Sequence, residues 1–169
     1  NADAYGDEHG VFTQGKAQGA TTFARLEGCW YGNSLIYLDS TNGGDRELGQ
    51  IWQYDPRNER LKLIFESPHK DVLDSPDNIT VSPRGGVVLC EDGDVLPQRI
   101  HGLTPEGQLF TFAENNVVLH GEHNGIEGDF RDQEYAGSTF SSDGKWLFVN
   151  IQTPGITFAI TGPWGNGLL

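Results

Sequence analysis

Short apolar runs, separated by Gly, Asn, Asp and Pro, follow one another along the chain from Thr21 onward. The runs are rich in β-branched and aromatic residues, and no long window repeats apolar residues at helical spacing. The pattern therefore predicts an all-β fold with little helix. The expected strands form three groups: residues 29–30, 34–38, 50–54 and 61–66; residues 79–81, 87–90, 99–103 and 109–113; and residues 138–140, 146–151 and 156–160.

Residues 1–20 lack this pattern. They are polar, Gly-rich and without period, so we expect a connecting or capping segment that is partly mobile. Residues 21–169 are expected to form the β-sheets of a single domain. Because the chain begins at Asn1 and contains no Met, we expect it to be a processed or incomplete product.

The strand groups recur at a spacing of about 50 residues. Residues 80–83 align with residues 139–142, which places Glu91 and Asn150 at equivalent strand ends, and Asp39 falls at the same position of the first group. Four-stranded sheets repeated at this period are typical of β-propeller blades. The sequence thus predicts a β-propeller portion of about three four-stranded blades, with the last strand of the third blade absent.

A propeller ring needs more blades than this portion supplies, since rings contain four to eight of them. An open fan of blades would also leave long strand edges unpaired. We therefore expect the remaining blades to come either from N-terminal sequence that this chain lacks or from a second chain.

A β-hairpin is predicted at residues 75–92, with a Pro-Arg-Gly-Gly turn between its strands. The open ends of an antiparallel hairpin lie side by side, so Asp77 and Asn78 should lie near Glu91 and Asp92. Three carboxylates and an amide would then share one edge of a sheet.

The strand ends of neighbouring propeller blades also meet around the central channel, which brings Glu27 of the first group to the same rim. Carboxylate and amide oxygens are the ligands that calcium and other hard cations prefer. Turn formation is the simpler explanation of a single Asp at a strand end, but it does not explain Glu27 and Glu91.

The charge of the chain fits such sites. There are 24 acidic and 11 basic residues, which gives a net charge of −13. This charge repels phosphate backbones and argues against nucleic-acid binding, while a solubilising acidic surface is the alternative to cation sites. No apolar run approaches the roughly 20 residues of a membrane span.

Cysteine and histidine suggest no other metal site. Cys29 and Cys90 form neither a disulfide framework nor a zinc pattern, so both are expected to be buried, with one disulfide between them as the alternative. His101, His120 and His123 are weaker candidates for metal ligands, because the last two belong to a long polar insertion that is typical of a loop at a pocket rim.

Six short motifs can be compared with known families. They are FARLEGCW at residues 23–30, DST at 39–41, LGQIW at 48–52, SPDNITVSPRGG at 75–86, CEDG at 90–93 and FVNIQTPG at 148–155. Together they resemble the C-terminal part of the PhoX-type alkaline phosphatases, from about Thr21 to Trp164. Because the motifs are dense along this stretch, the resemblance is specific.

The resemblance implies a six-bladed propeller that is exported through the twin-arginine route to the periplasm or the cell exterior. It also implies hydrolysis of small phosphate monoesters by a cluster of calcium and ferric iron. The isolated 169 residues are expected to be inactive, because the family's iron-binding cysteine lies in an N-terminal half that has no counterpart here. Neither Cys29 nor Cys90 matches that cysteine.

The same resemblance implies roles for individual residues. Glu27 resembles a carboxylate that bridges the metal cluster, and Arg25 resembles the arginine that holds the substrate phosphate. Asp77, Asn78 and Glu91 match later metal-binding loops of the family. At the position directly before Glu27 the family more often has Pro, and this chain has Leu26. This change should not alter the ligands.

Two other function classes remain open on the sequence alone. One is a calcium-stabilised propeller that binds a partner and catalyses nothing, which metal analysis and a phosphatase assay would distinguish. The other is a lactonase-like hydrolase on a similar propeller, which a screen of lactone substrates would reveal.

Overall fold

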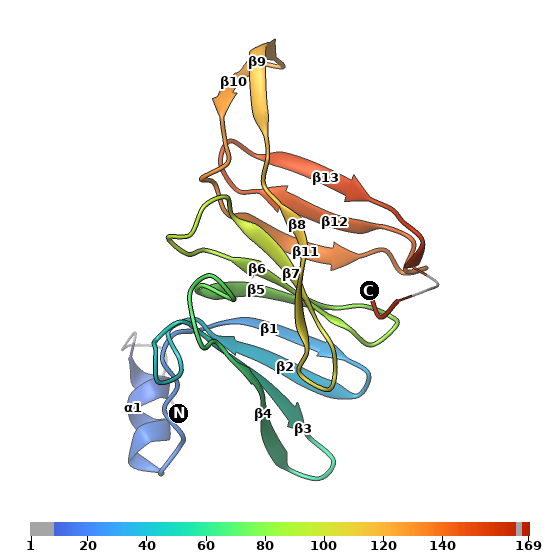
Figure 1. The fold of residues 1–169 in the computed structure, drawn as a ribbon. Coiled ribbons are helices and arrows are strands. Elements are labelled where there is room, and N and C mark those ends of the chain that lie inside the picture. Colours follow the sequence, from blue (N-terminus) through green and yellow to red (C-terminus); the bar gives the residue numbers. More distant parts are fainter. Residues whose placement is uncertain (1–8, 165–166) are drawn as a thin grey trace.

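The chain folds almost entirely into antiparallel β-strands (Figure 1). The computed structural model describes residues 9–164 and 167–169. Its elements are α1 (Gly10–Ala17), β1 (Leu26–Gly32), β2 (Leu35–Ser40), β3 (Gln50–Asp55), β4 (Arg60–Glu66), β5 (Pro76–Val81), β6 (Val87–Glu91), β7 (Arg99–Leu103), β8 (Leu109–Glu114), β9 (Val118–His123), β10 (Ile126–Asp129), β11 (Tyr135–Phe140), β12 (Leu147–Ile151) and β13 (Ile156–Ile160).

The strands form four antiparallel sheets. Two sheets have the orders β1-β2-β3-β4 and β5-β6-β7-β8, a third has the order β11-β12-β13, and β9 and β10 form a separate hairpin. Every strand group predicted from the sequence is confirmed, and the third sheet has three strands in the described part of the chain, as expected. The described sheets do not close into a barrel.

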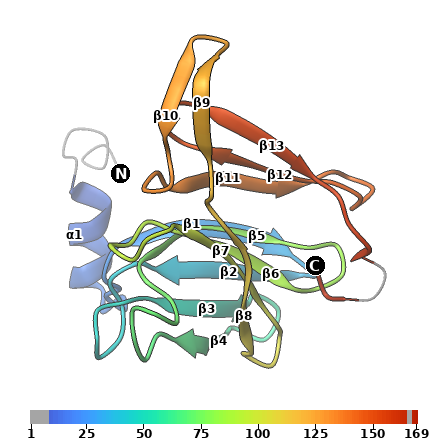
Figure 2. The same cartoon turned by 45° about the horizontal axis from the view of Figure 1, so that its top comes forward.

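The first strands of the three larger sheets lie side by side, with β5 between β1 and β11 (Figures 1 and 2). Two apolar cores hold this stack together. Leu89 of β6 packs into the core with Tyr37 and Ile79, whereas the next residue, Cys90, packs into the core with Val149. Strand β6 is therefore buried on both faces, which explains its continuous apolar sequence.

Each of these three first strands contains a shift of register against its neighbour. In the β5-β6 pair, Pro76 faces Glu91 and Asn78 faces Cys90, so Asp77 is an extra residue on β5. The β1-β2 pair shifts between Leu26 and Cys29, and the β11-β12 pair shifts in the same sense. A β-bulge of this kind bends the strand and redirects a side chain.

Three details differ from the sequence-based predictions. The predicted connecting segment contains helix α1, although residues 1–8 lie outside the described residues. The polar insertion is the β9-β10 hairpin rather than a loop. Asn150 is the fourth residue of β12, whereas Asp39 and Glu91 are the fifth of theirs, because the β11-β12 turn is longer than expected.

No helix in the described chain is long and apolar enough to cross a membrane.

The two cysteines are free thiols, so the alternative of a disulfide between Cys29 and Cys90 is wrong. Cys90 is buried as predicted, but Cys29 is exposed, because side chains alternate along β1 and its neighbours Gly28 and Trp30 are the residues directed toward the core. Burial raises the pKa of Cys90 to about 12.

We expect a thiol reagent to modify the exposed Cys29 in the folded chain and the buried Cys90 only after unfolding. A Cys29→Ser variant should lose the fast reaction, and two fast reactions in the wild type would contradict the assignment.

Candidate metal centre

Three carboxylates converge where the ends of β5, β6 and β11 meet. Asp77, Asp92 and Glu134 each place an oxygen within 4.8 Å of the others. Asp77 and Glu134 are half-buried and Asp92 is exposed, so the group opens to solvent on one side. We call these residues the acidic triad.

The topology explains why these residues meet. Asp77 is the bulge residue of β5, Asp92 directly follows β6, and Glu134 directly precedes β11. Because β5 pairs with β6 and packs against β11, the start of one strand lies beside the end of the next. The triad is thus drawn from two neighbouring sheets.

The electrostatics of the triad favour a bound cation. Burial, together with the nearby carboxylates of Glu134 and Asp92, raises the pKa of Asp77 to about 8. Burial and the charge of Asp92 likewise raise the pKa of Glu134. A multivalent cation would remove this repulsion and let all three groups ionise.

The oxygens of the triad fit a hard cation. All three ligand groups are carboxylates, the type of donor that calcium and iron accept. Oδ1 of Asp77 is buried and has no hydrogen-bond partner, although a buried carboxylate oxygen is normally satisfied. A cation contacting this oxygen would satisfy it.

Arg25 and Glu27 border the triad. The charge of Glu27 acts on Asp77 and on Glu134, and Nη2 of Arg25 lies 2.5 Å from Oε1 of Glu27. Arg25 also donates a hydrogen bond of 3.0 Å to Asn42. The backbone of Arg25 has a φ of 52°, an unusual conformation for a residue other than glycine, and its exposed guanidinium lies beside Glu27.

Asp39 lies behind Glu27 and is fully buried. Its Oδ1 accepts a 2.7 Å hydrogen bond from the Gly28 N–H, whereas its Oδ2 has no partner. Burial raises the pKa of Asp39 to about 6. The backbone at Gly28 passes so close to this carboxylate that a Cβ there would overlap it, so glycine is required at this position.

The other two predicted ligands make contacts within the protein. Oδ1 of Asn78 accepts hydrogen bonds from the backbone N–H and the hydroxyl of Ser138, at 2.9 and 2.8 Å. Glu91 is 1% exposed, and both its oxygens are bound by the guanidinium of Arg99. Nε2 of His101 lies 3.0 Å from Glu91 as well. The roles of Asn78 and Glu91 as metal ligands stay predictions.

The structure thus brings Arg25, Glu27 and Asp77 together and adds Asp92 and Glu134. The sequence placed Asp92 beside Asp77, but the choice of ligand fell on its neighbour Glu91. Glu134 gave no signal, because it lies between the β10 hairpin and β11, outside any apolar run. The predicted strand at residues 138–140 begins four residues after Glu134, whereas the observed β11 begins directly after it.

The metal-free chain should lose stability as the pH rises. Asp77 has a pKa of about 8 when folded and an ordinary value near 4 when unfolded, so the folded state holds the proton more tightly in between. The free energy of unfolding should therefore fall between about pH 5 and pH 8, as thermal melts in a chelator would show. An Asp77→Asn variant should show a weaker dependence, and an unchanged slope in that variant would contradict the shift.

Comparison with known protein families gives a match over most of the chain. A family model described as alkaline phosphatase PhoX matches residues 3–155 of the 169-residue chain. The matched range contains strands β1 to β12 and the whole acidic triad. No curated protein matches the chain.

Proposed function

Because the chain belongs to the PhoX alkaline phosphatase family, we propose that it carries part of a metal-dependent site that hydrolyses phosphate monoesters. The family is metal-dependent in general. The observation that carries the proposal is the acidic triad, whose three carboxylates lie within 4.8 Å of one another and are influenced by Glu27, the ion-pair partner of Arg25. The expected cations are calcium and ferric iron, in keeping with the all-oxygen donor set.

Asp77, Asp92 and Glu134 would hold the cations, and Glu27 would contact them from β1. Bound cations supply positive charge that offsets the triad and stabilises the phosphoryl oxygens during transfer. Without them, a phosphate dianion would be repelled by this acidic rim. The triad therefore makes substrate binding dependent on metal.

Arg25 would bind the phosphate. Its planar guanidinium can donate two hydrogen bonds to phosphate oxygens at once. In the structure this guanidinium is paired with Glu27, so it would exchange that carboxylate for phosphate when cations occupy the site. In hydrolysis, water oxygen forms a bond to phosphorus, the bond to the alcohol oxygen breaks, and a proton from the water passes to the alcohol.

We further propose that the three larger sheets are blades of a six-bladed propeller. The face of the first sheet that points away from the second carries apolar residues that nothing in the described chain covers. Tyr31 of β1 is 67% exposed, and Leu61 and Leu63 of β4 are also exposed. A further blade, from N-terminal sequence or another chain, would bury them. The family relation supports periplasmic or extracellular localisation.

The test uses the protein as its natural source produces it. Metal analysis should find calcium and iron, and the protein should hydrolyse p-nitrophenyl phosphate but neither the corresponding diester nor a lactone. Calcium binding without monoester hydrolysis would show a non-catalytic binding module. Lactone turnover would show a lactonase. Either result would overturn the proposal.

A further inference from the structure

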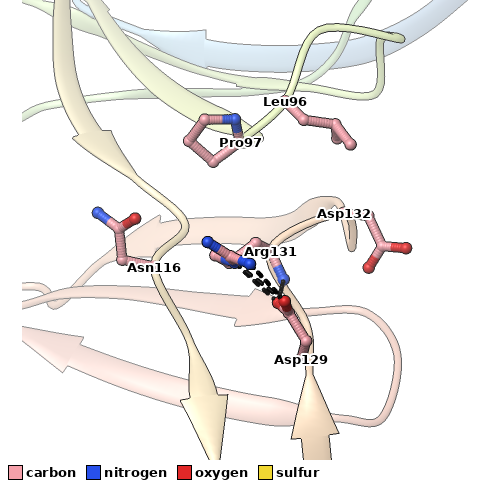
Figure 3. Close-up of a pocket in the computed structure, with 6 residues that line it drawn as sticks. All are labelled: Leu96, Pro97, Asn116, Asp129, Arg131 and Asp132. Atoms are coloured by element: carbon pink, nitrogen blue, oxygen red, sulfur yellow. Dashed lines mark hydrogen bonds and ion pairs between the residues drawn. The ribbon is translucent and has the colours of Figure 1, made fainter.

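A pocket of about 520 Å³ lies on the same edge of the sheets as the acidic triad. It is lined by Leu96, Pro97, Asn116, Asp129, Arg131 and Asp132 (Figure 3). Its volume falls in the range typical of small-molecule sites. None of these residues belongs to the triad or to the ion pair of Arg25 and Glu27.

The pocket lies next to the triad along the chain. Leu96 belongs to the connection that starts with Asp92, and Asp132 lies two residues before Glu134. The two connections are held to each other, because the backbone N–H of Gln98 donates to the carbonyl of Arg131 at 3.3 Å. The pocket and the triad are therefore built in part from the same two connections.

A third connection fixes the other wall. Asn115, which is fully buried, donates hydrogen bonds of 2.7 and 2.9 Å to the carbonyls of Phe130 and Gln133. These bonds hold the β8-β9 connection, with Asn116, against the segment that carries Arg131. The pocket is thus framed by backbone contacts within the described chain.

The walls differ in chemistry. Leu96 and Pro97 form an apolar side, and Asn116, Arg131 and Asp132 lie across from them (Figure 3). Arg131 is paired with Asp129, at 2.9 Å from Nε to Oδ1 and 2.5 Å from Nη2 to Oδ2, which neutralises both. Within the described chain, the carboxylate of Asp132 accepts a hydrogen bond of 3.0 Å from Gln133 and has no cationic partner.

Such a pocket suits a neutral molecule with many hydroxyl groups. The apolar face of a sugar or polyol would rest on Leu96 and Pro97, and its hydroxyls would bond to Asn116 and Asp132. The Arg131 guanidinium has one terminal nitrogen, Nη1, without a hydrogen bond in the described chain, and it could donate to a further hydroxyl. A leaving group with its own negative charge would be repelled by Asp132.

We propose that this pocket binds the alcohol portion of the substrate and selects neutral, hydroxyl-rich alcohols such as sugars and polyols. The proposal rests on the proposed function. The bond broken is the one between phosphorus and the alcohol oxygen, which takes a proton from the attacking water, and the neutral alcohol is the product left in the pocket.

The first test needs no turnover. Saturation-transfer NMR with methyl α-glucoside, in the presence of a chelator, reports binding of the sugar alone. The wild-type chain should transfer saturation to the ring protons. An Asn116→Ala/Asp132→Ala variant should weaken binding about tenfold, since it removes hydrogen bonds that include one to a charged group. An Asp143→Ala control alters an exposed acid on another hairpin and should bind normally.

Absence of transfer in the wild type, or equal transfer in the double variant, would overturn the proposal, provided that circular dichroism shows both chains folded. The second test compares substrates in the naturally produced protein. The same double variant should lower kcat/KM for glucose 6-phosphate about tenfold and leave p-nitrophenyl phosphate nearly unchanged. Equal losses for both substrates would overturn it, whereas no turnover of either would refute only the phosphatase function.

Discussion

An Asp77→Asn substitution should lower the affinity of the acidic triad for a divalent cation by at least about 100-fold and remove phosphatase activity. Loss of a residue that only orients a metal ligand lowers affinity by about 10- to 100-fold, so loss of a direct ligand should lower it more. The effect should be largest at Asp77, because it is the extra residue that the β5 bulge directs to this site and its Oδ1 has no partner within the described chain.

The stability of the variant separates a ligand from a structural residue. Asn has nearly the same shape as Asp but removes the repulsion with Asp92 and Glu134. The metal-free variant should therefore be as stable as the wild type or more so at about pH 8. An Asp45→Asn variant, in the exposed β2-β3 connection, should bind metal normally. Calorimetric titration with calcium measures affinity in all three chains, and a normal affinity in Asp77→Asn would refute the ligand assignment.

An Arg99→Ala substitution should lower the free energy of unfolding by about 3 to 5 kcal/mol. Its guanidinium is the only Arg or Lys group paired with Glu91 in the described chain, and Nε2 of His101 lies 3.0 Å from the same carboxylate. Removal of Arg99 would leave the negative charge of a carboxylate that is 1% exposed without compensation. Nη1 of Arg99 also donates a hydrogen bond of 2.6 Å to the carbonyl of Asp71, so the substitution would release the β4-β5 connection as well.

Chemical unfolding measures this effect, and two further variants locate its cause. Arg131→Ala removes an exposed ion pair and should change the free energy of unfolding far less than Arg99→Ala does. An Arg99→Ala/Glu91→Gln chain, in which the buried charge is also removed, should recover part of the lost stability. An equal loss in Arg99→Ala and Arg131→Ala would contradict the account, as would no recovery in the double variant.

The β-sheet framework was predictable because its signals are local. Apolar runs such as residues 87–90 and turns rich in Gly and Pro occur wherever β6 and its neighbours begin and end. The hairpin predicted at residues 75–92 also placed Asp77 near Asp92. The β9-β10 hairpin was missed because its residues are mostly exposed and carry no apolar alternation.

The candidate site was only partly predictable, because it depends on contacts between distant residues. Glu91 ends β6 and Asp92 directly follows it, and the sequence does not show which one points inward. Glu91 points inward because Arg99 and the backbone N–H of Asp74 bind its carboxylate. The Asp74 N–H donates a hydrogen bond of 2.7 Å to it. Glu134 reaches the triad through the packing of β11 on β5, which no local pattern encodes.

The bulge in β5 divides that strand into two parts with different freedom to vary. Side chains of a strand alternate between its faces, so one added residue reverses the alternation on one side of it. Ile79 and Val81, which follow Asp77, pack into a core, while Pro76, the one residue of β5 before it, is set in the opposite phase. Deletion of a single residue there would exchange rim and interior positions, so we infer that sequence changes at the rim are tolerated only when the length of the strand is kept.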